Sequence, residues 1–193
     1  MKLLHLDASA LGANSVTREL SSAIVARWQA DVPGLDITYR DLDSHPLPHL
    51  TGAALAGSDP VAAADAAQAL EQFLASDVVV IGAPMYNFGI PSTLKAWIDR
   101  IAVAGKTFRY TEAGPQGLAG DKQVIVASGR GSALGDDSPA DFQEAYLRQL
   151  FGFLGIDNLR FVRAEGVALS PDHRSRALAA AHAAINAPLL AAA

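Results

Sequence analysis

Short hydrophobic stretches recur along the chain, and segments with helical spacing separate them. The most apolar stretch, Val78 to Ile81, carries no charge, so it predicts a strand that is buried on both faces and ends at Gly82. Four further strands are expected at residues 2–7, 35–42, 123–127 and 159–169. Strands that alternate with helices predict a doubly wound α/β fold, with a five-stranded parallel sheet and helices on both faces.

Hydrophobic residues three and four positions apart mark the helices. One helix begins near Val16 with Ser15 as its N-cap, and another follows Pro91. Further helices are expected in the Ala-rich segment before the third strand, from Tyr146 to a stop at Gly155, and at residues 172–190. No linker or repeat divides the chain, so we expect a single domain over residues 1–193 with the strand order 2-1-3-4-5.

The loop after the third strand combines backbone hydrogen-bonding groups with aromatic side chains. In an open α/β sheet, ligands bind in the crevice outside the carboxyl ends of the strands, and this is where Met85, Tyr86, Asn87 and Phe88 are expected. Such a loop suits a flat heterocycle better than a phosphate, which needs several donors. A turn whose aromatic side chains only cap the core is the structural alternative.

The loop after the first strand is rich in hydroxyl groups. Ser9 follows the strand, and Ser15 and Thr17 flank the first residue of the next helix. A helix N-terminus offers unpaired N–H groups and a positive dipole end, so these hydroxyls indicate a site for one phosphate. No GxGxxG or GxxxxGKS/T sequence follows the strand, which argues against a dinucleotide pyrophosphate and a nucleoside triphosphate. The same residues could instead serve only as caps and turns.

A glycine-rich loop, Ser128-Gly129-Arg130-Gly131, follows the fourth strand. Its glycine spacing does not match a dinucleotide fingerprint, but glycines at the end of a strand let backbone N–H groups approach a ligand closely. A surface loop without a ligand is the alternative. Together, a phosphate at the first loop, a ring at the second and N–H donors at the third describe a mononucleotide with a flat heterocycle, and FMN fits this description.

Composition narrows the possible functions. The chain has 15 Lys and Arg residues against 20 Asp and Glu, a net charge of −5 without a basic block, which argues against a nucleic-acid partner. It has no cysteine, so any redox chemistry requires a cofactor. His45 and His49 lack a third ligand nearby in sequence, so no metal site is expected. The apolar runs are too short to span a membrane and no leader segment is visible, so we expect a cytoplasmic protein.

The chain resembles the FMN-dependent NADH azoreductase family of flavodoxin-like quinone reductases. The resemblance covers nearly the whole chain and rests on these matching segments: Pro84 to Phe88 with Pro91, Leu94-Lys95 and Asp99; Thr107 to Glu112; Gly114-Pro115; Gly117-Leu118; and Ser128. It implies a flavodoxin-like fold and a homodimeric enzyme that holds FMN noncovalently. In the implied ping-pong cycle, NADH or NADPH reduces the flavin and leaves, and a quinone or an azo compound then takes the two electrons.

The resemblance also implies which residues meet each part of FMN. They are Ser9, Ser15, Val16 and Thr17 for the phosphate; Met85, Tyr86, Asn87 and Phe88 for the isoalloxazine; and Ser128, Gly129, Arg130 and Gly131 for its pyrimidine edge. The family often has Ser-Arg-Gly-Gly in the last loop, where this chain has Ser-Gly-Arg-Gly. The backbone donors of the loop survive this change.

Two aromatic residues are candidates for contact with the substrate. Tyr110 lies in an excursion at residues 106–118 that could be a lid, a dimer contact or a surface hairpin. By the resemblance, Tyr110 and Phe153 lie near the substrate, partly across the dimer interface. No acid or base is obligatory, and Asn87 and Tyr110 are the candidate proton donors. The alternative function is an electron-carrier flavodoxin without its own small-molecule substrate.

Overall fold

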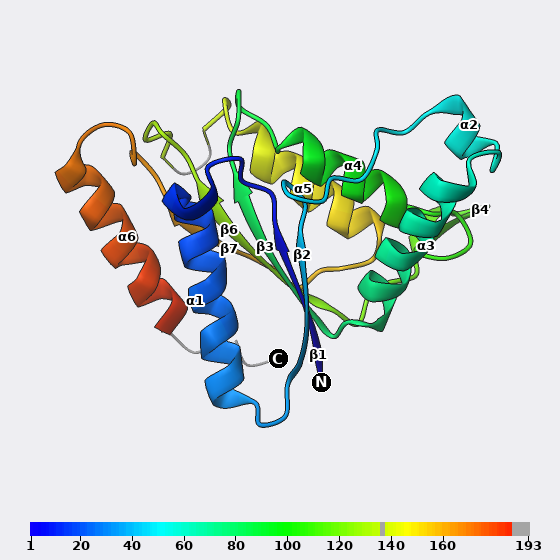
Figure 1. Cartoon of the computed structure of the whole chain (residues 1–193), viewed down its shortest axis with the longest axis horizontal. Coiled ribbons are helices and arrows are strands. Elements are labelled where there is room, and N and C mark those ends of the chain that lie inside the picture. The colour runs from blue at the N-terminus through cyan, green and yellow to red at the C-terminus, as the bar shows by residue number, and fades with distance from the viewer. Residues whose placement is uncertain (136–137, 187–193) are drawn as a thin grey trace.

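The computed structural model describes residues 1–135 and 138–186, and its centre is a parallel sheet of five strands (Figure 1). The order across the sheet is β2-β1-β3-β6-β7, and each neighbouring pair is parallel. The strands are β1 (Lys2–Asp7), β2 (Asp36–Asp41), β3 (Val78–Pro84), β6 (Gln123–Gly129) and β7 (Leu159–Ala164). Because all five run in one direction, the loops that follow them gather at one edge of the sheet.

Helices cover both faces of the sheet (Figure 1). One face carries α1 (Val16–Asp31) and α6 (Pro171–Asn186), and the other carries α3 (Pro60–Ala75), α4 (Ser92–Ile101) and α5 (Phe142–Phe153). Two short elements, η1 (Gly12–Asn14) and α2 (Gly52–Leu55), lie in the connections. The expected terminal helix extended to residue 190, and residues 187–190 lie outside the described residues.

The helix expected from Tyr146 begins earlier. In the structure, α5 starts at Phe142 because Asp141 acts as its N-cap, accepting a hydrogen bond from the backbone N–H of Glu144 at 2.9 Å. This first turn contains the polar residues Gln143 and Glu144, and the hydrophobic spacing begins only after it. The spacing alone therefore did not reveal the start of the helix.

Each central strand sends alternate side chains into two separate hydrophobic cores. Val79 and Ile81 of β3 belong to the core that β3 shares with α3, α4 and α5. Val78 and Val80 belong to the core on the side of α1 and α6. Every residue of β3 is buried, which confirms the strand buried on both faces that the uncharged run predicts.

A two-stranded antiparallel hairpin, β4 (Phe108–Thr111) and β5 (Gly114–Gly117), lies apart from the main sheet. It occupies the excursion at residues 106–118, which lies between β3 and β6 in the sequence. These two additional strands change the numbering, so the sheet order is β2-β1-β3-β6-β7 where 2-1-3-4-5 was expected. A Cβ at Gly117 would overlap the backbone of Leu154 and Gly155. The missing side chain therefore lets the hairpin pack directly on the end of α5.

Strand β3 ends at Pro84, two residues beyond the predicted end at Gly82. The Gly82 carbonyl accepts a hydrogen bond from Ala8 N at 3.0 Å, so Gly82 and then Pro84 turn their backbone groups toward β1. Strand β1 ends opposite Gly82, so no donor is required at Pro84 and a proline is tolerated there.

Strands β6 and β7 also differ from their predicted ends. β6 runs beyond Ala127 to Gly129, because Ala83 and Pro84 of β3 pair with Ser128 and Gly129. β7 ends at Ala164 instead of residue 169, because Gly166, with φ of 69°, turns the chain.

Candidate functional site

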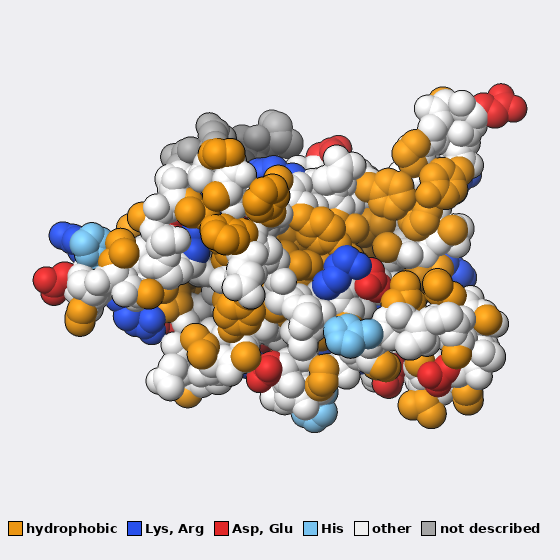
Figure 2. Space-filling model, turned by 90° about the horizontal axis from the view of Figure 1, so that it is seen from above, with side chains coloured by type: hydrophobic (Ala, Val, Ile, Leu, Met, Phe, Trp, Pro, Cys, Tyr) orange, Lys and Arg blue, Asp and Glu red, His pale blue; other side chains and the backbone are white. Residues whose placement is uncertain are grey.

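A cleft of about 200 Å³ lies at the edge where β1, β3 and β6 end. Figure 2 shows the molecule from above this edge, with hydrophobic side chains gathered across the middle of the face. The cleft is lined by Ser9, Leu11, Asn14, Ser15, Val16, Thr17, Pro84, Met85, Tyr86, Gly129, Gly131, Val167, Ala168 and Arg174. It thus brings together members of all three loops that sequence analysis selected. Asn87, Phe88, Ser128 and Arg130 are not among its lining residues.

The first turn of α1 forms one end of the cleft. Ser15 caps the helix by accepting a hydrogen bond from Arg18 N at 3.2 Å, and its hydroxyl lies 3.1 Å from that of Thr17. The N–H groups of Val16 and Thr17 belong to the first turn, where a helix provides no carbonyl partner. Hydroxyls, free N–H groups and the positive end of a helix dipole are groups that can bind a phosphate.

Tyr86 joins the second loop to the first. Its hydroxyl accepts a hydrogen bond from Ala10 N at 3.2 Å and lies 3.4 Å from the hydroxyl of Ser9. At its backbone, Tyr86 and Gly89 exchange two hydrogen bonds of 3.0 Å, which close a two-residue turn over Asn87 and Phe88. The phenol thus holds the two loops side by side.

The turn over Asn87 and Phe88 is strained. Both residues have positive φ, 49° and 70°, as a type I′ turn requires. Asn tolerates this conformation, but for a bulky residue such as Phe it is unusual and costs about 1–3 kcal/mol. The Phe88 side chain is also 54% exposed. An exposed aromatic residue in a strained conformation is typical of a ligand-binding turn, because packing in the core does not explain it.

The third loop approaches the first through Gly129. A Cβ at this position would lie 2.8 Å from Thr17 Cγ2, so the backbone passes close to the first turn of α1. The neighbouring Ser128 hydroxyl is buried and donates to Gln143 Oε1 at 2.8 Å, away from the cleft. The amide of Gln143 in turn donates to the carbonyls of Ala83 and Pro84 at 3.1 and 3.0 Å. This buried side chain therefore ties the second and third loops together.

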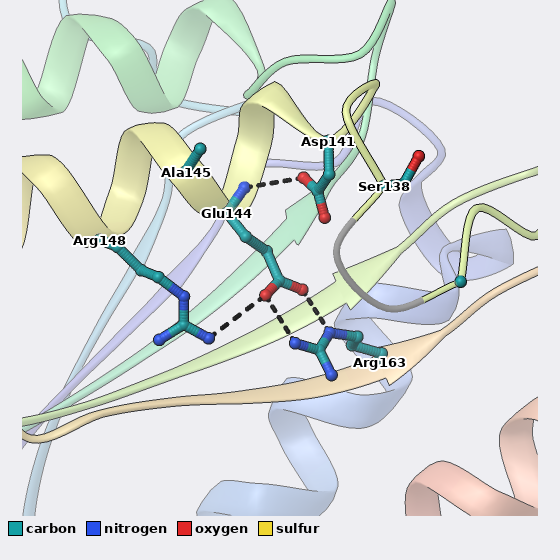
Figure 3. Close-up of a pocket in the computed structure, with 7 residues that line it drawn as sticks. Ser138, Asp141, Glu144, Ala145, Arg148 and Arg163 are labelled. Atoms are coloured by element: carbon teal, nitrogen blue, oxygen red, sulfur yellow. Dashed lines mark hydrogen bonds and ion pairs between the residues drawn. The ribbon is translucent and has the colours of Figure 1, made fainter.

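The side chain of Arg130 points into the protein and is only 2% exposed. Its guanidinium is ion-paired with Asp141 at 2.7 Å, Glu144 at 3.0 Å and Glu165 at 3.2 Å. Glu144 also contacts Arg148 and Arg163, as Figure 3 shows. The carboxylate partners of Arg130 therefore hold its side chain away from the cleft, and this loop lines the cleft through Gly129 and Gly131.

The two substrate candidates lie outside the cleft. Tyr110 is on β4 and is 75% exposed, and Phe153 is at the end of α5. Phe108 connects them, because its ring centroid lies 5.6 Å from that of Tyr110 and 4.5 Å from that of Phe153. The three rings form one aromatic cluster at the base of the hairpin.

A sequence profile for proteins of flavodoxin-like fold matches residues 1–189. The chain belongs to this family. It is similar to the FMN-dependent NADH:quinone oxidoreductase of Stenotrophomonas maltophilia, with 63% identity over 185 residues that cover 96% of this chain and 94% of the relative.

Two solved structures have the same fold over almost their whole length. An azoreductase from Bacillus anthracis is 31% identical, with a TM-score of 0.85 and 96% of each chain covered. An FMN-dependent NADH-azoreductase from Bacillus anthracis, solved in complex with FMN, is 25% identical, with a TM-score of 0.86 and 95% of each chain covered.

Residues 1–135 and 138–186 contain neither a membrane-spanning helix nor a cluster of metal ligands. No helix there is long and apolar enough to cross a membrane. No group of three His, Cys, Asp or Glu side chains is placed to hold a metal ion, and this includes the region of His45 and His49.

Arg18 supports the first loop and was missed by sequence analysis. Its Nε and Nη2 donate to the Ser9 carbonyl at 3.3 and 2.9 Å, and its two Nη atoms bind both carboxylate oxygens of Asp41 at 2.8 and 2.7 Å. The Arg18 guanidinium holds the pKa of the Asp41 carboxyl well below its usual range. No local signal reveals this pair, because Asp41 lies on the next strand.

Removal of the buried guanidinium of Arg130 should destabilise the fold. We expect Arg130→Met to lower the free energy of unfolding by about 3 kcal/mol, since it leaves the partly buried carboxylates of Asp141 and Glu165 without this cation, while Arg163 still pairs with Glu144. Arg148 contacts the same carboxylate but its side chain is 54% exposed, so the control Arg148→Met should cost about 1 kcal/mol or less. Urea unfolding measures both, and equal losses would contradict the prediction.

The Asp41 carboxyl should make stability depend on pH. Its pKa is lowered in the folded state, so its contribution is present above the unfolded pKa of about 4 and is lost as pH falls below it. Asp41→Asn should therefore be less stable than the wild type at pH 7, with a smaller difference at pH 3. Asp43→Asn is the control, because its side chain is exposed. A difference between wild type and Asp41→Asn that does not change with pH would refute the assignment.

Proposed function

We propose that the protein is an FMN-dependent NAD(P)H oxidoreductase that reduces quinones to hydroquinones and cleaves azo bonds to aromatic amines. The observation that carries this proposal is the convergence of three loops on one cleft: the first turn of α1, Met85 and Tyr86 after β3, and Gly129 with Gly131 at the end of β6. The names of the similar proteins support the same activity, because they include a quinone oxidoreductase and azoreductases that depend on FMN and NADH.

The residues around the cleft fit FMN. Ser9, Ser15 and Thr17 would bind the phosphate with their hydroxyls, together with the N–H groups at the start of α1. Met85 to Phe88 would support the isoalloxazine. The backbone of residues 128–131 would meet its pyrimidine edge, since Gly129 and Gly131 line the cleft.

Once bound, FMN supplies the redox chemistry. The side chains do not supply it, because the chain has no cysteine that could take up and release electrons reversibly. The protein's own contribution is to orient the ring and to place backbone N–H donors where negative charge develops. An azo bond needs two rounds of two-electron transfer to reach two amines. Asn87 and Tyr110 are exposed and remain the candidate proton donors beside solvent.

A visible absorption spectrum under anaerobic conditions tests the proposed activity. We expect the purified protein to show flavin bands that bleach on addition of NADH and return on addition of a quinone or an azo dye. No protein partner is added, so turnover under these conditions separates the enzyme from an electron-carrier flavodoxin. A colourless protein that neither takes up added FMN nor oxidises NADH would refute the proposal.

We further infer a homodimer whose partner copy completes the site. The cleft of about 200 Å³ is smaller than typical small-molecule pockets of about 300–1,000 Å³. Beyond it, Phe88 and Tyr110 are 54% and 75% exposed. A second copy over this face would cover both rings and, with Phe153, would form the substrate pocket.

Sedimentation equilibrium at micromolar concentration should therefore give a mass twice that of the 20.1 kDa chain. Tyr110→Asp should shift the equilibrium toward monomer, because it places a charge in the covered face. A wild-type protein that sediments only as a monomer would contradict the inference.

The cytoplasmic location stays a prediction.

A further inference from the structure

Arg174 approaches the cleft from α6, a helix that sequence analysis did not connect with the site. α1 and α6 run in the same direction, and both begin at the edge where the strands end (Figure 1). Three contacts fix their register: Arg174 Nη2 to Asn14 O at 3.4 Å, His182 Nε2 to Glu19 Oε1 at 3.0 Å, and Arg27 Nη1 to Asn186 O at 3.1 Å. The first turn of α6 is therefore held beside η1, just before α1 begins.

The charge of Arg174 distinguishes it from its neighbours in the cleft. Among the described residues that line the cleft, it is the one with a charged side chain. Arg18 is bound to both oxygens of Asp41, and Arg130 is surrounded by three carboxylates. The guanidinium of Arg174, in contrast, donates to the described residues only a long hydrogen bond of 3.4 Å, which goes to a carbonyl. Its donors are thus available to an anion.

A cation would strengthen the binding of a phosphate in this cleft. A phosphate monoester carries a charge of about −1.5 to −2 at pH 7, whereas the N-terminus of a helix supplies only about +0.5. The hydroxyls of Ser9, Ser15 and Thr17 donate hydrogen bonds but carry no charge. A guanidinium supplies a full charge and forms strong, charge-assisted hydrogen bonds with phosphate oxygens.

We propose that Arg174 binds the phosphate of FMN and makes the cleft select FMN over riboflavin, the same flavin without its phosphate. The identity of the phosphate rests on the function proposed above. The half-buried side chain needs only to exchange the Asn14 carbonyl for a phosphate oxygen. Arg174 is thus a specificity-determining residue at the phosphate end of the site, remote from the reacting ring.

Flavin titrations of Arg174→Gln test this role. Protein freed of flavin is titrated with FMN and, separately, with riboflavin, and the quenching of flavin fluorescence gives each Kd. We expect Arg174→Gln to weaken FMN binding about 10- to 100-fold, as for loss of a hydrogen bond to a charged group, and to leave riboflavin binding unchanged. Arg174→Lys, which keeps the charge, should lie between the variant and the wild type.

The matched control is Arg176→Gln. Arg176 is exposed on the same helix two positions later, which places it about 200° around the helix axis from Arg174. The substitution Arg176→Gln removes the same charge from α6 but on another side of the helix, so FMN binding should stay close to that of the wild type. A raised salt concentration should weaken FMN binding by the wild type more than by Arg174→Gln, because the lost interaction is ionic.

Three results would overturn the proposal. Equal weakening of FMN and riboflavin would mean that Arg174 only supports the fold of the cleft. Unchanged FMN binding in Arg174→Gln would mean that the phosphate does not meet this residue, and a raised KM for NADPH in that case would assign it to the donor's phosphate instead. A wild-type protein that binds neither flavin would refute the proposed function itself, which is a distinct outcome.

Discussion

The parallel pairing of β3 with β6 continues past the hydrophobic part of both strands, and the geometry of the cleft depends on it. Pro84 pairs with Gly129, and Met85 N then donates to the Gly129 carbonyl at 2.8 Å. Gln143 fixes the same point from beneath, because its buried amide contacts both strands. The second and third loops therefore leave the sheet from a common rigid base. Two loops that start from fixed positions need little ordering when a ligand binds.

Charge is distributed around the cleft in a consistent way. Two arginines are neutralised by carboxylates within the protein and hold the loops: Arg18 fixes the first loop and Arg130 the third. Their positive charges are balanced locally and contribute little to the field at the cleft. The walls themselves are lined by apolar side chains, hydroxyls, backbone groups and one guanidinium. The arginines that support the shape of the site are thus distinct from Arg174, the arginine that lines the cleft.

Hydrophobic spacing predicted the fold well because the central strands are buried on both faces and leave a clear signal. It also selected the residues next to the strand ends, such as Ser9, Tyr86 and Gly129, since a parallel sheet brings those positions to one edge. It failed where a role depends on distant contacts. Gln143 meets Ala83 across 60 residues and Arg174 meets Asn14 across 160 residues. The direction of the Arg130 side chain was likewise hidden, because its acidic partners lie in α5 and after β7.

The strained turn at Phe88 sets stability and function against each other. Glycine adopts positive φ without cost, so Phe88→Gly would relieve the turn and stabilise the free protein. The same change would remove the exposed ring that we propose to support the isoalloxazine. Thermal selection alone, whether in a directed-evolution experiment or in a computational redesign, would favour glycine at this position and discard the ring. The conformation of a single residue thus marks a point at which a more robust protein would be a poorer catalyst.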